Sequence, residues 1–494
     1  MHLDRATIIL ICVGFYMLTC IGIGLWAMRR TKSSRDFFMA GRDLGIVVTG
    51  VAVFSSMMSG FGFVGGPGLV YGLGMSSVWM VVAAPIGYCL TFFLLGKRLR
   101  LMGELCDSVS LPDVVAARYN SEACRLLTAL AIVLGVMGYL GAQILAMATV
   151  LRGIVSNHPA IGEVSLEMCV TVSVAVLVFY CVTGGIIASV YTDLIQGLMM
   201  VVAAILVFAT AVHSFGGGVH GVVETIQADD SEAILPWGTL GIVGSLSWFF
   251  LFAIGNVGQP HVVTKLMMNK KITDARYILF FSVIGYLLSA LLWVSIGLVM
   301  RAHVLSGSYP PLENSDQAAP QFLQAFAHPV LAGLVFAGLF SAIMSTADAF
   351  LNIGAAAIVH DIPKALRGHS LRRELLWART VTVILAIVAA MFALYLNDLV
   401  ALLGAFGWGT FAAALVPTIA IGFNWKRATA PAAIAAILSS LLINFVIRVS
   451  GITLPHGLQV GAVSLLVSLL LFFGISFYSR PAELDPDIEA VMEM

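Results

Sequence analysis

The sequence predicts an all-α polytopic membrane protein with thirteen transmembrane helices. Its composition, its long apolar segments and the placement of its basic residues predict this. Of the 494 residues, 60% are hydrophobic and 11% charged, whereas soluble proteins average about 45–50% and 25%. The mean hydropathy of +0.99 over the whole chain requires lipid as the solvent. A soluble enzyme or a secreted disulfide scaffold is excluded, and the balance of 26 basic and 26 acidic residues gives no reason to expect nucleic-acid binding.

A helix that crosses the hydrocarbon core needs about 20 mostly apolar residues. The first apolar segment is too long for the apolar part of a signal peptide, so we expect it to be a true span. The thirteen expected spans are 7–28, 45–65, 75–96, 126–150, 164–183, 190–212, 240–258, 277–300, 329–354, 380–396, 399–423, 428–447 and 458–478.

The basic residues predict how the chain is oriented in the membrane. With the N-terminus outside, all but four of the 26 Lys and Arg residues fall in inner loops or in the inner tail. Basic residues accumulate on the cytoplasmic side of membrane proteins. The sequence therefore predicts an N-out, C-in topology. The four exceptions are Arg5, Arg152, Arg301 and Arg448.

We expect one transmembrane transporter domain over 1–494. Its expected parts are a first peripheral helix and inner loop (1–44), a ten-helix core (45–425), two peripheral helices (426–480) and a mobile cytoplasmic tail (481–494). The core divides into spans 2–6 and spans 7–11. Each set has an odd number of spans, so the second is inverted relative to the first.

Two spans of the core contain residues that favour a helix break. The second span ends in a run rich in Ser and Gly with one Pro (55–68), and the seventh ends in Gly255-Asn-Val-Gly-Gln-Pro-His261. Glycine loosens a helix and proline removes a hydrogen-bond donor. Interrupted helices at matching positions of inverted repeats indicate a substrate and ion site near the midplane. We therefore expect broken helices 2 and 7.

The expected spans contain no Lys, Arg or His, and their ionisable residues are Glu167, Asp193 and Asp348. Glu167 is expected near the outer surface. Asp193 and Asp348 are expected at the same depth, roughly 5–10 Å from the cytoplasmic edge. A carboxylate at such depth usually marks an ion path or a paired site. Both are candidates for a second ion, and the alternative is pairing with basic residues of the inner loops.

A pair of hydroxyl residues precedes Asp348. On a helix, Ser345 and Thr346 lie on the same face as Ala342, three and four residues earlier. Their hydroxyls and the Ala342 carbonyl would form a cluster of oxygen ligands. The alternative is that each hydroxyl bonds only to a preceding carbonyl of its own helix.

These motifs resemble the sodium:solute symporters, a family that includes bacterial proline and pantothenate permeases. The resemblance covers nearly the whole chain. The residues that carry it are Phe38-Met-Ala-Gly-Arg42, Ser59-Gly60 through Gly65-Gly-Pro-Gly68, Thr192-Asp193 through Gln196-Gly197, Gly258-Gln-Pro-His261, Ser341-Ala-Ile-Met-Ser-Thr346 and Trp425-Lys-Arg427.

The resemblance implies a sodium site between the second and ninth spans. Its ligands would be the carbonyls of Ser55, Met58 and Ala342 with the hydroxyls of Ser345 and Thr346. Some members hold a second ion with ninth-span serines and the sixth-span aspartate, here Asp193. In this chain Asp348 and Ala349 occupy the following two hydroxyl positions. Proline permeases carry an aspartate where this chain has Met57.

The resemblance also implies which residues line the solute cavity. They would be Ser59, Gly60, Phe61, Gly62, Tyr139, Gln143, Trp248, Phe252, Asn256 and Gln259. Sugar-carrying members use charged side chains in the cavity, and the third and eighth expected spans of this chain have none, which disfavours a sugar. The absence of an arginine within the spans likewise disfavours a bulky acid. A small amino acid or monocarboxylate fits better, because helix ends can hold its carboxylate.

The expected function is therefore sodium-coupled import of a small organic solute by alternating access, with proline as one candidate. The alternatives are a proton-coupled permease of the same fold and pantothenate-type carboxylate uptake. The expected location is the bacterial inner membrane. The expected partners are the solute, Na⁺ and the lipid bilayer; we expect no enzymatic activity, no cofactor beyond the coupling ion and no obligate protein partner.

Overall fold

The computed structural model describes residues 4–494 except 30–33, 40–43, 157–161, 397–398 and 482–483, and these residues are almost entirely helical. Residues 40–42 of the sequence motif 38–42 therefore lie outside the described residues. The elements of the first half are α1 (Arg5–Met28), α2 (Ser34–Met39), α3 (Ile46–Met57), η2 (Phe61–Gly65), α4 (Gly66–Leu73), η3 (Gly74–Val78), α5 (Trp79–Leu105), α6 (Leu111–Tyr119), α7 (Glu122–Val155), α8 (Leu166–Ser214) and α9 (Gly218–Asp229).

The second half continues in the same way. Its elements are α10 (Gly241–Gly255), η4 (Asn256–Gly258), α11 (Pro260–Leu266), η5 (Ile272–Asp274), α12 (Ala275–Leu305), η6 (Ser315–Gln317), α13 (Ala318–Phe326), α14 (Pro329–Ala356), η7 (Ala357–Asp361), α15 (Ile362–Arg367), α16 (Glu374–Leu396), α17 (Val400–Leu415), η8 (Val416–Ile421), α18 (Ala430–Val449), η9 (Pro455–Gly457), α19 (Val460–Tyr478) and α20 (Pro486–Glu493).

Eleven helices of the described chain are long and apolar enough to cross a membrane. Two further apolar helices, Ile46–Met57 and Leu166–Phe179, are shorter. The first is the part of the second expected span that precedes its interruption. The second is the start of α8, whose 49 residues cover two expected spans, 164–183 and 190–212.

Both expected interruptions are present. α3 ends at Met57, and Met58 has the non-helical angles φ −82° and ψ 74°. A Cβ atom on Gly60, just beyond the break, would lie 2.6 Å from the Cβ of Ala146 on α7, so this position requires glycine. α10 ends at Gly255, Gln259 is extended, and Pro260 begins α11. Proline is suited to this first helical position because its missing N–H would have no helical partner there.

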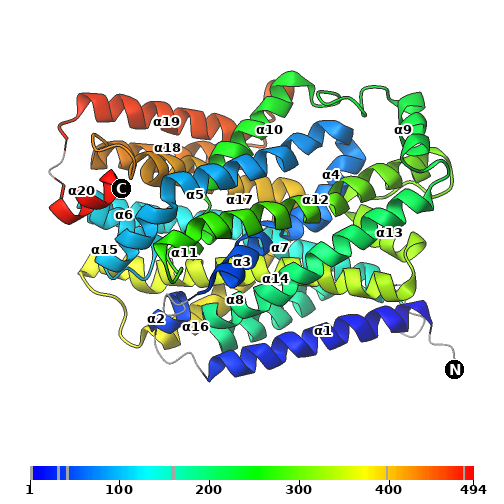
Figure 1. Ribbon diagram of the computed structural model, residues 1–494, viewed down its shortest axis with the longest axis horizontal. Helices are drawn as coiled ribbons and strands as arrows, with labels where there is room; N and C mark the ends of the chain where they lie inside the picture. The colour runs from blue at the N-terminus through cyan, green and yellow to red at the C-terminus, as the bar shows by residue number, and fades with distance from the viewer. Residues whose placement is uncertain (1–3, 30–33, 40–43, 157–161, 397–398, 482–483) are drawn as a thin grey trace.

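The long helices lie side by side, roughly along the long axis of the molecule (Figure 1). α1 lies along one edge, and α18 and α19 lie along the opposite edge (Figure 1). The beginning of α1 and the short helix α20 lie at opposite ends of the bundle (Figure 1). Between the two edges, α7, α14 and α17 are the most buried of the long helices.

Two sequence expectations need correction. Lys265, expected in an inner loop, belongs to α11 and is 1% exposed. The tail, expected to be mobile, forms α20, whose residues Ile488, Val491 and Met492 are buried. The Met492 carbonyl accepts hydrogen bonds from Arg98 on α5 at 3.2 and 3.3 Å. Apolar residues spaced along one face of the acidic tail explain the packing, because they cover apolar surface while the carboxylates stay outside.

Gly66 on α4 provides a test of the packing. A Cβ atom at this position would lie 2.2 Å from the indole ring of Trp293 on α12. We expect Gly66→Ala to destabilise the protein by about 1–3 kcal/mol, as overpacking does, and to lower the midpoint of thermal unfolding in detergent. Gly14→Ala on α1 is the matched control, because no atom lies within 4 Å of its added Cβ. Equal midpoints for the two variants would contradict the expectation.

Candidate functional site: an ion and solute site at two interrupted helices

The hydroxyls of Ser345 and Thr346 on α14 point at the end of α3. Ser345 Oγ donates to the Ser55 carbonyl at 3.2 Å, and Thr346 Oγ1 donates to the Ser56 carbonyl at 2.9 Å. Both hydroxyls also lie 3.2 Å from the Ala342 carbonyl of their own helix. All these residues are fully buried. The alternative, in which each hydroxyl bonds only to a carbonyl of its own helix, is therefore wrong, because each hydroxyl also donates to a carbonyl of α3.

Four of the five expected sodium ligands are thus brought together: the Ser55 and Ala342 carbonyls and the two hydroxyls. The fifth, Met58, is the residue that ends α3, and its N–H donates to the Phe54 carbonyl at 2.9 Å. Ser56 contributes a carbonyl to the cluster that the sequence did not suggest. Carbonyls freed at an unwound helix and neighbouring hydroxyls are oxygen ligands suited to Na⁺.

The interruption explains why the Ser56 carbonyl is available. In a continuous α-helix it would accept the Gly60 N–H, four residues later. That N–H instead donates to Oε1 of Gln143 on α7 at 2.8 Å. Ser59 turns toward the same helix, with its Oγ 3.2 Å from the hydroxyl of Tyr139. Residues of α7 therefore hold α3 in the broken form.

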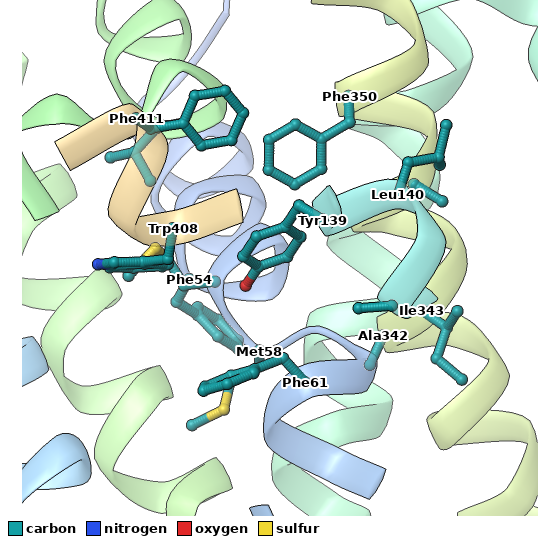
Figure 2. Packing of buried hydrophobic residues seen from close by; sticks show 14 of the residues in the cluster. Phe54, Met58, Phe61, Tyr139, Leu140, Ala342, Ile343, Phe350, Trp408 and Phe411 are labelled. Carbon is teal, nitrogen blue, oxygen red and sulfur yellow. The ribbon is translucent and has the colours of Figure 1, made fainter. Parts of the chain in front are cut away.

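The residues expected to line the solute cavity lie beside this break. Phe61 stacks on Phe252, with ring centroids 5.7 Å apart, and Phe252 stacks on Trp248 at 5.6 Å. The ring of Tyr139 lies 6.4 Å from that of Phe61. In Figure 2 the phenol oxygen of Tyr139 points toward Phe61 and Met58. Gly62 follows Phe61 within η2 and is buried.

Further aromatic rings pack against Phe61, Phe252 and Tyr139, and the sequence did not predict a role for them. Trp408 of α17 stacks on Phe252 at 4.8 Å, and Trp293 lies edge-on to Phe61 at 6.0 Å. His261 lies between Tyr139 at 6.1 Å and Phe350 of α14 at 4.6 Å. Figure 2 shows Phe350 and Phe411 next to Tyr139, on the side away from its hydroxyl. The sequence contains His261 in a motif but does not show which face of a span each aromatic residue occupies.

Several buried polar atoms beside these rings have no hydrogen-bond partner in the described part of the chain. They are both amide atoms of Asn256, Oε1 of Gln259, both ring nitrogens of His261 and Nε1 of Trp408. The Gln259 Nε2 does donate to the Gly255 carbonyl, at 3.0 Å. A buried polar group without a partner is rare and costly. A cluster of them favours a site that a polar ligand or water completes.

Asp193 on α8 forms an ion pair. Its Oδ2 accepts a hydrogen bond from Lys265 Nζ at 2.8 Å, and the two side chains are 0% and 2% exposed. Pairing with a basic residue was the alternative to an ion site at this position. Lys265 comes four residues after the motif that ends at His261, and the short helix α11 brings it inward.

Asp348 is buried two residues beyond Thr346. Its carboxylate lies beside the side chains of Cys181 and Ser189 of α8 and close to Asp193. The structure therefore gathers Asp193, Asp348 and Lys265 in one group next to the hydroxyl pair.

A second charged cluster lies at the helix ends, around Asp113 of α6. Its Oδ1 accepts from Lys364 at 2.8 Å and from Arg125, and its Oδ2 lies 3.0 Å from His360 Nε2. Burial alone would raise the pKa of Asp113, but the bonds from His360 and Lys364 hold this pKa well below its ordinary value. Asp113, His360 and Asp361 are close enough to share a metal ion. The two cations already occupy the Asp113 carboxylate, so the cluster is better explained as an ion-pair network joining α6, α7 and α15.

A model of the sodium:solute symporter family matches residues 37–439. The chain belongs to this family. The matched residues include both interrupted helices and the hydroxyl pair Ser345 and Thr346. The family match therefore covers the candidate site described above.

Curated relatives cover nearly the full length. The chain is 25% identical over 498 residues to the osmoregulated proline transporter OpuE of Bacillus subtilis (strain 168), covering 98% of each chain. It is 28% identical over 457 residues to the sodium/proline symporter of Escherichia coli (strain K12), covering 90% of this chain and 88% of the relative.

Among solved structures, a Na⁺-coupled sialic acid symporter in a substrate-bound outward-open state matches with a TM-score of 0.79 and 20% identity, covering 98% of this chain and all of the other. A nucleobase-cation-symport-1 family transporter matches with a TM-score of 0.55 and 14% identity, covering 92% and 98%. These likenesses show the transporter fold.

The Asp193–Lys265 pair can be tested by a double-mutant cycle. Removing one charge leaves the other buried and unpaired, which typically costs about 3–5 kcal/mol. We expect Asp193→Asn and Lys265→Met each to lower the thermal unfolding midpoint in detergent strongly. The double variant removes both charges and should recover most of the loss. Additive losses would show that the two side chains do not stabilise each other.

Proposed function

We propose that this protein is a secondary active symporter that couples the import of a small organic solute to sodium entry by alternating access. The observation that carries the proposal is the contact between the α14 hydroxyls and the carbonyls at the broken end of α3. Family membership supports the same class of function. No step requires a reaction at a covalent bond, so the chain acts as a carrier and not as an enzyme.

The proposed topology has thirteen spans with the N-terminus outside and the C-terminus inside. Spans 2–6 and 7–11 form two inverted repeats, and the interruptions at Met58 and Gln259 fall in the first span of each. The relative from Escherichia coli supports a bacterial inner-membrane location.

In the proposed sodium site, the Ser55, Met58 and Ala342 carbonyls and the Ser345 and Thr346 hydroxyls surround the ion. Without an ion the hydroxyls donate to the carbonyls; with Na⁺ bound, the same oxygens would turn their lone pairs to the ion. The ion would thereby hold the end of α3 against α14. The solute residues Ser59 to Gly62 follow directly, so sodium binding would order them and raise solute affinity. Such coupling is reciprocal.

The proposed solute is a small zwitterion or monocarboxylate, such as proline. Two relatives are named as proline transporters. The unpartnered amide of Asn256, Oε1 of Gln259 and Nε1 of Trp408 would bind its polar groups. The rings of Phe61, Phe252 and Trp248 would cover its apolar part. An aromatic surface also attracts an ammonium group.

The energetics are sufficient for nutrient uptake. One charge moving through about 100 mV yields about 2.3 kcal/mol, and a tenfold sodium gradient adds about 1.4 kcal/mol. Together these allow solute accumulation of roughly several hundred-fold per sodium ion.

Replacing the two hydroxyls tests the sodium site. Ser345→Ala with Thr346→Ala removes two ligands, so the sodium concentration that half-activates uptake in proteoliposomes should rise more than tenfold, a change of over about 1.4 kcal/mol. Thr210→Ala is the control, because its hydroxyl is on the surface of α8 and bonds only to Leu206 of the same helix. An unchanged sodium dependence in the double variant would remove the two hydroxyls from the site.

A thermal-shift panel tests the solute class and the driving ion together. Proline, other small amino acids and short monocarboxylates are added to the purified protein with sodium or with potassium at constant pH. A substrate should stabilise the protein, because it binds the folded state, and it should do so more strongly with sodium. Stabilisation that depends on pH but not on sodium would instead favour the proton-coupled alternative.

A further inference from the structure

Lys265 is a buried lysine with three oxygen partners. Its Nζ donates to the Asp193 carboxylate at 2.8 Å, to the Ala52 carbonyl at 2.8 Å and to the Ser56 hydroxyl. An ammonium group has three donors and no acceptor, so all three are used. The three partners come from α8 and α3, while Lys265 belongs to α11. The charge therefore joins three elements at the core of the proposed site.

The partners of this ammonium are of the same kinds that bind a metal cation. They are one carboxylate, one backbone carbonyl and one hydroxyl, all buried. Ala52 and Ser56 are one helical turn apart on α3 and face the same side. Ser56 also borders the proposed sodium site, since its carbonyl accepts from the ligand Thr346. Two cation positions are therefore adjacent and separated by the single residue Ser56.

We propose that the Lys265 ammonium is a tethered cation that occupies a second ion position, so that the protein binds one sodium ion and Asp193 is not a sodium ligand. This inference rests on the proposed sodium site. The tethered charge cannot leave the protein, so it cannot carry energy from the gradient. It neutralises Asp193, and the neutral pair offers no net attraction to a second sodium ion.

The proposal differs from a merely structural ion pair in one consequence. If the ammonium occupies an ion position, removing it without removing Asp193 exposes a carboxylate, a carbonyl and a hydroxyl around a small vacated space. Such a space should admit a free sodium ion. If the pair only stabilises the fold, its removal changes stability but not the number of ions bound.

The experiment counts bound sodium directly, so it needs no knowledge of the solute. The full chain, purified in detergent, is equilibrated with radiolabelled sodium at constant ionic strength, with choline as the balancing cation. The wild type should bind one sodium per chain. Lys265→Ala should bind two, because Asp193 becomes available. Lys265→Met with Asp193→Asn should again bind one, because both charges are gone.

The number of sodium ions bound by each variant distinguishes the proposal from its alternatives. Two sodium ions bound by the wild type, or one bound by a folded Lys265→Ala variant, would overturn the proposal and leave the sodium site between α3 and α14 intact. No sodium bound by the wild type would refute that site itself and the proposed function with it. If Lys265→Ala does not fold, Lys265→Gln keeps most of the side chain and lacks the charge, and it should also bind two.

Discussion

The hydrogen bond from the Gly60 N–H to Gln143 is the interaction on which the rest of the site depends. In a continuous helix the Gly60 N–H would donate to the Ser56 carbonyl, but here it donates to Gln143. The freed carbonyl then faces Thr346 across the bundle. Without this diversion α3 could continue through Met58, and its carbonyls would be used within the helix. A hydrogen bond that lies outside the proposed sodium ligands thus creates the oxygen cluster.

Ser56 contacts two parts of the site that are far apart in the sequence, the α14 hydroxyls and Lys265 of α11. Its carbonyl faces the α14 hydroxyls, and its hydroxyl faces the ammonium of Lys265. A structural change at the α14 hydroxyls can therefore reach Lys265 through Ser56 alone, and the reverse also holds. Ser56 lies in the last turn of α3, and Lys265 lies in α11, the helix that follows the interruption after α10. This arrangement explains how events at two distant segments of the chain meet at one point.

Much of this was predictable from the sequence. Apolar length identified the membrane helices, and the Ser- and Gly-rich run predicted the interruption near Met58. The spacing of Ala342, Ser345 and Thr346 predicted a shared face. The contribution of Trp408 was not predictable, because a span that is apolar all round does not show which face is buried. Lys265 was missed because its depth depends on the angle at which α11 enters the bundle. The packing of α20 was missed because its acidic composition conceals three apolar residues on one face.

The close contact between Gly66 and Trp293 has a consequence for motion. The indole lies directly on the backbone of α4, so α4 and α12 should travel as one rigid body. The non-helical residues Met58 and Gln259 are then the places where the backbone can pivot with little loss of hydrogen bonding. Met58 is one of the proposed ion ligands and Gln259 one of the proposed solute ligands, so in the proposed cycle occupancy of the site and the angle between the two bodies would be set at the same residues.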